Sequence, residues 1–185
     1  MALTKTPVFD FGKKAEDFKL KSIENKIISL NDVKGEKATL IMFICNHCPY
    51  VKAIIRDLAK DCNQLKKDGI NSVAIMSNDT KNYPEDSFDN MIKFAKANNF
   101  GEINYLIDET QDIAKKYGAV CTPDFFGYNK DLKLQSRGRF RELKDLKPTS
   151  GGDSDLKVAM KMISETQAGP KEQIPSMGCN IKWFN

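Results

Sequence analysis

The hydrophobic residues of this chain gather in short, uninterrupted runs, a pattern that indicates strands buried on both faces. Residues 39–44 form such a run, residues 70–77 are predicted to form a second strand of the buried type, and residues 105–107 a short strand. Apolar stretches on either side of polar turns predict two hairpins, over residues 18–29 and 125–135. The pattern therefore predicts a sheet that combines single strands with hairpins.

Hydrophobic residues at helical spacing lie between these strands. In the clearest case they follow Pro49 and recur three and four residues apart until Gly69, which can end a helix in the left-handed conformation. Strands that alternate with helices imply parallel crossovers, while the hairpins add antiparallel strands. The four predicted helices begin after Pro49, at Pro84, after a cap at Asp108 for residues 109–117, and after a cap at Asp153 or Ser154.

The last residues, 169–185, have no regular period, yet they carry several large apolar side chains. A tail of this composition is expected to dock on the rest of the chain. The predicted fold class is therefore α/β, with a central mixed β-sheet flanked by helices, an N-terminal β-hairpin extension and a docked C-terminal tail. We expect a single domain over residues 1–185, with its core at about 37–168. The apolar tail residues are Ile174, Ile181, Trp183 and Phe184.

Composition and charge exclude several classes of function. The net charge of +4 is spread over the chain, whereas a nucleic-acid binder concentrates positive charge in one patch. No apolar run approaches the ~18 residues of a membrane span, and residues 1–7 lack the pattern of a signal peptide. We therefore expect a cytoplasmic protein without nucleic-acid or membrane partners. Arg137, Arg139 and Arg141 alternate, so on a strand they would share one face. They could hold an acidic partner there, but a solvated edge is the favoured interpretation.

The cysteines favour redox chemistry over a structural role. Five is an odd number, which disfavours a closed framework of disulfides, and disulfides in the cytoplasm are mostly transient and catalytic. A zinc site would have to be assembled from distant residues, because the chain has one histidine and one C-x-x-C pair. We expect neither a metal nor an organic cofactor. The cysteines are Cys45, Cys48, Cys62, Cys121 and Cys179.

The C-x-x-C pair, Cys45-Asn46-His47-Cys48, lies where a buried strand is predicted to end and a helix to begin. Unpaired N–H groups and partial positive charge at the helix start would stabilise a thiolate at Cys45, and Cys48 is close enough to resolve a mixed disulfide. A protonated His47 would lower the pKa of Cys45 further; the alternative is an exposed loop histidine without a role. Two passively packed cysteines are the alternative for the pair, but their position favours a redox centre.

Thr122-Pro123 is a second candidate feature, because X-Pro bonds are the usual place for a cis peptide. With these residues the chain resembles the thioredoxin superfamily, and more closely its peroxiredoxin-like branch, related to alkyl hydroperoxide reductase and thiol-specific antioxidant. The resemblance implies a thioredoxin fold. The matching segments are residues 43–52, 78–87, 122–126, 137–139 and 178–183.

The resemblance implies that Pro123 is a cis-proline opposite Cys45, and that the Thr122 backbone is free to pair with an extended substrate peptide. An ordinary turn with a trans-proline is the alternative. Cys121 is a possible further redox partner, although a packed thiol is the simpler interpretation. Cys179 lies in the tail where the family also has a cysteine, and a third redox role is open. Cys62 falls on the apolar stripe of its helix and is expected to be core.

One departure from the peroxiredoxin pattern bears on the activity. Aligning Cys48 with the peroxidatic cysteine places Ile41 and Cys45 where peroxiredoxins carry the proline and threonine that support the reaction. The leading hypothesis is therefore a thiol–disulfide oxidoreductase, with Cys45 as nucleophile and Cys48 as resolving cysteine. Its partners would be protein or small-molecule disulfides and thiols. The alternatives are a thiol peroxidase with antioxidant activity and a redox-sensing binding module.

Overall fold

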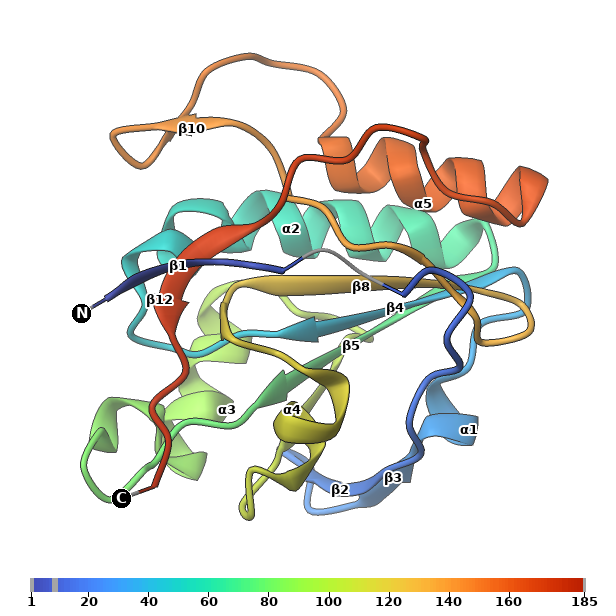
Figure 1. The fold of residues 1–185 in the computed structure, drawn as a ribbon. Helices are drawn as coiled ribbons and strands as arrows, with labels where there is room; N and C mark the ends of the chain where they lie inside the picture. Colours follow the sequence, from blue (N-terminus) through green and yellow to red (C-terminus); the bar gives the residue numbers. More distant parts are fainter. Residues whose placement is uncertain (1, 8–9, 185) are drawn as a thin grey trace.

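A central seven-stranded sheet organises the computed structural model, which describes residues 2–7 and 10–184 (Figure 1). Its strands are β2 (Lys19–Ser22), β3 (Ile27–Ser29), β4 (Ala38–Phe43), β5 (Ile70–Met76), β6 (Asn104–Ile107), β8 (Asp124–Asn129) and β9 (Leu134–Ser136). They lie in the order β3-β2-β6-β5-β4-β8-β9. Strands β4, β5 and β6 are parallel, and the hairpins β2–β3 and β8–β9 add antiparallel strands on either side. The predicted mixed sheet and its N-terminal hairpin extension are confirmed.

The helices are α1 (Leu30–Val33), α2 (Pro49–Lys67), η1 (Pro84–Asp86), α3 (Phe88–Ala97), α4 (Asp112–Tyr117) and α5 (Asp155–Thr166). Pro84 does not begin a continuous helix as predicted, because the extended Ser87 separates the 3-10 turn η1 from α3. Asp108 accepts a hydrogen bond from the Ala114 N–H at 2.9 Å, yet α4 starts later than predicted, at Asp112. Within the described residues, no helix is long and apolar enough to cross a membrane.

Alternate residues of β4 supply the two cores of the molecule. Leu40 and Met42 pack in a cluster with apolar residues of α2, α3 and α5. Ile41 and Phe43 pack in a second cluster with residues of α1 and α4. Figure 1 shows α2 and α5 together on one side of the sheet. The continuous apolar run over residues 39–44 is thus explained by a strand that is buried on both faces.

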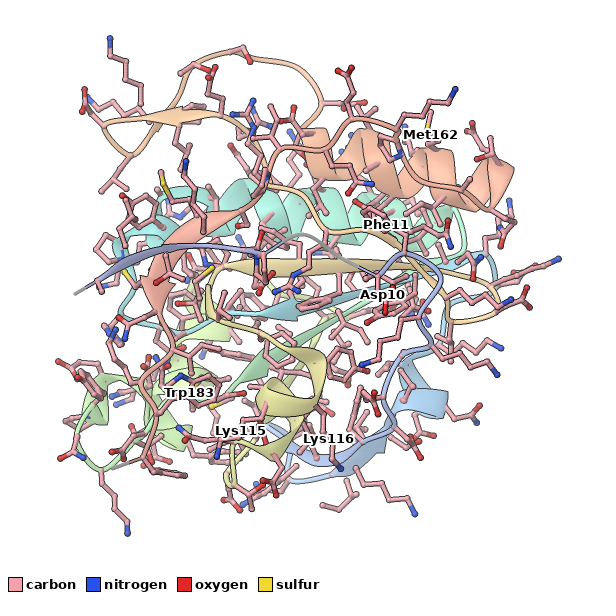
Figure 2. All side chains as sticks on the ribbon, viewed as in Figure 1. Asp10, Phe11, Lys115, Lys116, Met162 and Trp183 are labelled. Atoms are coloured by element: carbon pink, nitrogen blue, oxygen red, sulfur yellow. The ribbon has the colours of Figure 1, made fainter. Side chains whose placement is uncertain are left out.

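The C-terminal tail docks as predicted, and part of it is a strand. A small antiparallel sheet has the order β1-β12-β7, built from β1 (Leu3–Lys5), β12 (Met177–Asn180) and β7 (Cys121–Thr122). Beyond β12, Ile181 is buried in the second core. Trp183 then lies by α4, with the Lys115 ammonium 5.8 Å from its ring (Figure 2). A separate hairpin joins β10 (Leu143–Lys144) to β11 (Lys147–Pro148).

The expected solvated edge of alternating arginines is wrong for Arg137. Strand β9 ends one residue earlier, and the Arg137 side chain is buried beneath the start of β8. Its Nε and Nη2 donate to the two carboxylate oxygens of Asp124 at 2.9 and 2.7 Å. A buried guanidinium requires a partner of this kind, so the pair fixes the residue that follows Pro123.

Candidate active site

The two cysteines of the motif lie between the end of β4 and the start of α2, as predicted. Strand pairing extends to Ile44, whose N–H donates to the Ile75 carbonyl at 3.0 Å. Cys48 is the N-cap of α2, and Pro49 is the first helical residue. Cys45 is 1% exposed and Cys48 0% exposed. Neither sulfur is therefore accessible to a substrate in this arrangement.

Thr122 lies against both sulfurs of the motif. The Cys45 Sγ is 3.3 Å from the Thr122 hydroxyl, and the Cys48 thiol donates to the Thr122 carbonyl at 3.2 Å. The peptide bond between Thr122 and Pro123 is cis. The predicted cis-proline is confirmed, and β7 is the element that brings it to the redox motif.

The backbone edge beside the cis-proline is occupied by the tail. Strand β12 pairs with β7 in antiparallel register, with Cys179 opposite Thr122 and Asn180 opposite Cys121. The prediction that the Thr122 backbone is free for a substrate peptide is therefore wrong for this arrangement. The tail makes within the chain the kind of pairing that was expected from a substrate.

The same register places a third cysteine in the motif. The Cys179 Sγ lies 3.1 Å from the Cys48 Sγ, and both cysteines are free thiols. Burial and the hydrogen bond with Cys48 raise the pKa of Cys179 to about 12. Three sulfurs therefore meet at the Thr122 corner of the sheet.

The other two cysteines have different surroundings. Cys121 precedes Thr122 on β7, so its side chain points to the opposite face of the strand and lies 3.6 Å from the Pro123 carbonyl oxygen. Its pKa is raised, chiefly by burial. Cys62 lies on the buried face of α2, where burial raises its pKa to about 12. The expectation that Cys62 belongs to the core is confirmed.

Asp86 is the functional candidate that the sequence did not reveal. This fully buried carboxylate accepts hydrogen bonds from the Asn46 and His47 backbone N–H groups at 2.7 and 3.3 Å. Its second oxygen lies 2.7 Å from the His47 Nδ1 and 2.8 Å from the Asn78 amide nitrogen. These contacts raise the pKa of His47. The only signal was its place in the segment 78–87, which matches the family.

His47 thus has a defined position in the loop. Its ring is paired with the buried Asp86 and stacks on the Tyr83 ring, with the centroids 5.6 Å apart. Cys45 contributes a sulfur to the same group, so that one ligand atom from each of Cys45, His47 and Asp86 lies within 4.8 Å of the others. In the described part of the chain this is the one group of three such residues that could hold a metal ion. Both Asp86 oxygens are already engaged in hydrogen bonds with Asn46, His47 and Asn78. The expectation that the redox pair works without a metal or organic cofactor stays a prediction.

Negative charge is favoured on the Cys48 sulfur. A hydrogen bond from the Cys45 thiol lowers the pKa of Cys48 to about 5, with further support from Cys179 and from the Val51 N–H in the first turn of α2. Burial and the nearby Thr122 carbonyl oppose this shift. The helix start therefore acts on Cys48, the cysteine that caps it.

Cys45 has the opposite balance. The hydrogen bond it gives to Cys48, its burial and the nearby Asp86 carboxylate all raise the pKa of Cys45 well above its usual value. The sequence-based expectation placed the thiolate on Cys45, whereas these contacts favour Cys48. The titrations of Cys45 and Cys48 are therefore coupled, because the charge on each sulfur changes the pKa of the other.

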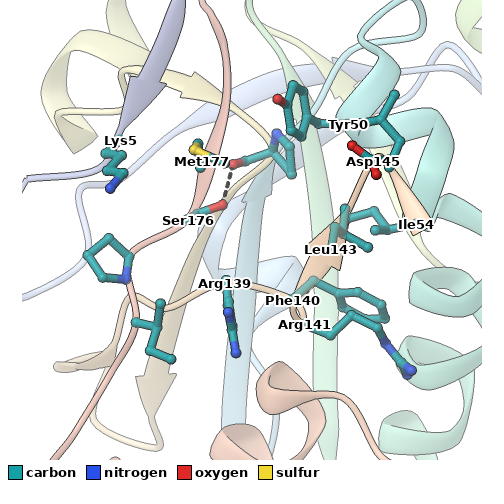
Figure 3. Close-up of a pocket in the computed structure, with 14 residues that line it drawn as sticks. Lys5, Tyr50, Ile54, Arg139, Phe140, Arg141, Leu143, Asp145, Ser176 and Met177 are labelled. Carbon is teal, nitrogen blue, oxygen red and sulfur yellow. Dashed lines mark hydrogen bonds between the residues drawn. The ribbon is translucent and has the colours of Figure 1, made fainter. Parts of the chain in front are cut away.

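A cleft of about 450 Å³ opens beside the cis-proline (Figure 3). Tyr50 and Ile54 of α2 form one side, and the tail residues Ile174 and Met177 form another. Ser176 closes the base by donating from its hydroxyl to the Pro123 carbonyl at 2.7 Å. The lining is mostly apolar, but it also carries four charged side chains: Lys5, Arg139, Arg141 and Asp145.

The model of the AhpC/TSA family matches residues 11–139, which include the motif and the cis-proline. The chain belongs to this family. No curated protein matches the chain. The family assignment, together with the fold, supports a thiol redox function for this AhpC/TSA protein.

Solved structures similar to this AhpC/TSA protein fall into two groups. An uncharacterized conserved protein from Geobacillus kaustophilus is 41% identical, with a TM-score of 0.89 over 100% of this chain and 97% of the other. A hypothetical protein from Sinorhizobium meliloti 1021 is 36% identical, with a TM-score of 0.90 over 98% of each chain. The thioredoxin domain of a thiol-disulfide oxidoreductase from Bacteroides vulgatus is 19% identical, with a TM-score of 0.59 over 70% of this chain and 89% of that domain. The last of these supports the thioredoxin fold.

Proposed function

We propose that this AhpC/TSA protein is a thiol–disulfide oxidoreductase in which Cys45 and Cys48 cycle between dithiol and disulfide. The observation that carries the proposal is the shared contact of both sulfurs with Thr122, next to the cis-Pro123 bond. A second support is the low pKa of Cys48, about 5, because the thiolate is the form that attacks a disulfide.

The contacts favour Cys48 as the attacking thiolate and Cys45 as the resolving cysteine. Cys48 attacks one sulfur of a substrate disulfide, forms a mixed disulfide, and releases the other substrate sulfur as a thiolate that takes up a proton. Cys45 then loses its proton and attacks the Cys48 sulfur. This step closes the Cys45–Cys48 disulfide and releases the second substrate thiol, so that two electrons pass to the substrate.

Asp86 and His47 are placed to receive the proton that Cys45 must lose. The Asp86 carboxylate raises the pKa of Cys45 and lies within hydrogen-bond distance of the His47 ring. His47 itself is half-buried. A base so near a high-pKa thiol lowers the barrier to resolution. We therefore propose that the Asp86–His47 pair accepts this proton.

The substrates we propose are protein or small-molecule disulfides and thiols in the cytoplasm, with no metal or organic cofactor. The cleft beside Pro123 supports a substrate with an apolar body, because its lining is mostly apolar.

A trapping experiment tests the couple and its direction. Ellman's disulfide is added to Cys45→Ser and to Cys48→Ser, each in a Cys179→Ser background, and the released thionitrobenzoate is counted. Cys45→Ser should release one equivalent and keep a mixed disulfide on Cys48, whereas an intact couple releases a second equivalent on closure. Capture on Cys45 instead would make Cys45 the attacking cysteine and Cys48 the resolving one. Capture on neither cysteine would exclude a Cys45–Cys48 redox pair.

A thiol peroxidase is the second candidate, and one observation favours it. Cys48 has a pKa of about 5, as a thiolate that attacks peroxide requires, and the motif comparison aligns it with the peroxidatic cysteine. The test is to add hydrogen peroxide to the reduced protein and follow sulfenic acid formation on Cys48. Oxidation no faster than that of free cysteine would exclude this activity.

A further inference from the structure

We propose that Cys179 is a third redox cysteine, which forms a disulfide with Cys48 in exchange for the Cys45–Cys48 disulfide. Strand β12 holds Cys179 at the position where a cysteine of a bound substrate strand would lie. The proposal rests on the proposed function, because it requires that Cys48 takes part in disulfide exchange.

The pairing of β12 with β7 has the form of a bound peptide. Cys179 faces Thr122 in antiparallel register, directly beside Pro123. Strand addition of this kind brings the side chains of the added strand to fixed positions on the sheet edge. On β12 the side chain brought to the redox motif belongs to Cys179, with its sulfur 3.1 Å from that of Cys48.

Anchors on both sides of Cys179 fix this register. Upstream, the Ser176 hydroxyl donates to the Pro123 carbonyl at 2.7 Å, and the Ser176 carbonyl accepts from the Thr6 N–H at 3.1 Å. Downstream, the Lys182 N–H donates to the Asn78 side-chain oxygen at 2.8 Å. The segment between these anchors is therefore held over the motif by contacts that do not involve sulfur.

Gly178 permits the close approach of the tail. A Cβ atom at this position would overlap the Thr122 carbonyl oxygen and touch the Pro123 ring. Any larger residue would push β12 away from β7 and separate the Cys179 sulfur from that of Cys48. The glycine next to Cys179 thus belongs to the geometry that makes the sulfur contact.

The exchange step needs no external oxidant. Starting from the Cys45–Cys48 disulfide, the Cys179 thiol loses its proton as its sulfur attacks the Cys48 sulfur. The Cys48–Cys179 bond forms, the Cys45–Cys48 bond breaks, and Cys45 leaves as a thiolate. The proton lost by Cys179 is balanced by the proton that Cys45 gains. In the structure the Cys48 and Cys179 sulfurs are separate thiols in contact. Closing a disulfide between them requires the two sulfurs to approach by about 1 Å, to the usual ~2.05 Å.

The position of the disulfide would then control access to the motif. A Cys48–Cys179 disulfide ties β12 covalently over Thr122, where the motif is buried. A Cys45–Cys48 disulfide leaves the tail held by hydrogen bonds alone, so that a substrate strand can displace it. Because β1 pairs with the other edge of β12, the N-terminal strand would move with the tail.

Disulfide mapping of the full chain tests the proposal. The reduced protein is oxidised in glutathione buffers of increasing potential, its free thiols are blocked in acid, and tryptic peptides are analysed by mass spectrometry. Cys45 and Cys48 share the peptide 38–52, whereas Cys179 lies in the peptide 172–182. A closed 38–52 peptide reports the first disulfide, and a 38–52/172–182 cross-link in monomeric protein reports the second.

The expected result is both species in the wild type and in Cys62→Ala, the matched control. Cys45→Ser should move essentially all of the oxidised monomer into the cross-linked species, and Cys179→Ser should leave only the closed peptide. If no cross-link forms in the wild type at any potential, or if Cys45→Ser leaves Cys179 free, the proposal is overturned. If the closed peptide also fails to form, the proposed function itself is overturned.

Discussion

Cys62 and Cys179 are both buried, at 2% and 5% exposure, and burial is the main reason why each has a pKa of about 12. Their neighbours differ. Cys62 lies among apolar residues of α2. Cys179 lies on a strand held against the Cys48 sulfur. Burial and pKa alone therefore do not distinguish a cysteine packed among apolar residues from one that contacts a second sulfur; the neighbouring atoms do.

The same difference extends to the regions around the two cysteines. The middle of α2 is held mainly by apolar packing. The Thr122 corner brings β4, β7, β12 and η1 together through hydrogen bonds to Thr122 and Asp86, so that its geometry depends on several distant segments. Changes of similar size should consequently have chemical effects at the corner and only effects on stability in α2.

The largest expected effect concerns the two cysteines of one helix, Cys48 at its N-cap and Cys62 in its buried stripe. Cys48→Ser should reduce the rate of disulfide reduction by at least about 100-fold, since it removes the attacking sulfur. Cys62→Ala should keep the rate within about twofold, because it removes only packing atoms. Steady-state reduction of a model disulfide measures both rates. An equal loss in Cys62→Ala would contradict the distinction between the two regions.

A second comparison uses two glycines. Gly178→Ala should lower the free energy of unfolding by about 1–3 kcal/mol, because the new Cβ overlaps the Thr122 carbonyl and displaces β12. Gly151→Ala, which meets no atom within 4 Å, should change it by less than about 0.5 kcal/mol. Urea denaturation measures both values. Alkylation of Cys48 should also become faster in Gly178→Ala, and an unchanged rate would show that the tail does not shield the motif.

The pH dependence of stability should have opposite signs for Cys48 and Cys62. The folded pKa of Cys48, about 5, lies below the usual ~8.5, so its thiolate stabilises the fold above pH ~8.5, and this contribution is lost as pH falls toward 5. The pKa of Cys62 is raised to about 12, so its contribution is present below pH ~8.5 and is lost as pH rises. Unfolding free energies of the wild type, Cys48→Ser and Cys62→Ala across this range measure both trends. Parallel pH curves for the two variants would contradict the assignment of the thiolate to Cys48.

Local patterns predicted the parts of the site that depend on neighbouring residues. The change from strand to helical period at Pro49 located the motif at a strand–helix junction, and Pro123 was expected to be cis. Contacts between distant segments were not predictable in this way. The buried Asp86 lies 40 positions from Asn46, and the pairing of Cys179 with Thr122 depends on a register that no local pattern encodes.

The tail and the arginines illustrate the same limit. The apolar composition of residues 169–185 was enough to predict docking, because large apolar side chains favour burial. It gave no information on which edge the tail would cover. Alternation suggested a solvated Arg137, but the buried Asp124 draws its guanidinium inward. A charge pattern indicates exposure only where no opposite charge is buried nearby.

The smallest expected effect concerns the ion pair between His47 and Asp86 at the Thr122 corner. Because Asp86 raises the pKa of His47, the ion pair stabilises the fold below pH ~6.5, and this contribution is lost as pH rises through the higher folded value. Asp86→Asn should bring the pKa of this single histidine down, as measured by NMR titration. Asp89→Asn, which changes an exposed acid on α3, should leave it nearly unchanged. Asp86→Asn should also slow the closure of the Cys45–Cys48 disulfide, and unchanged closure would leave Asp86 with a structural role only.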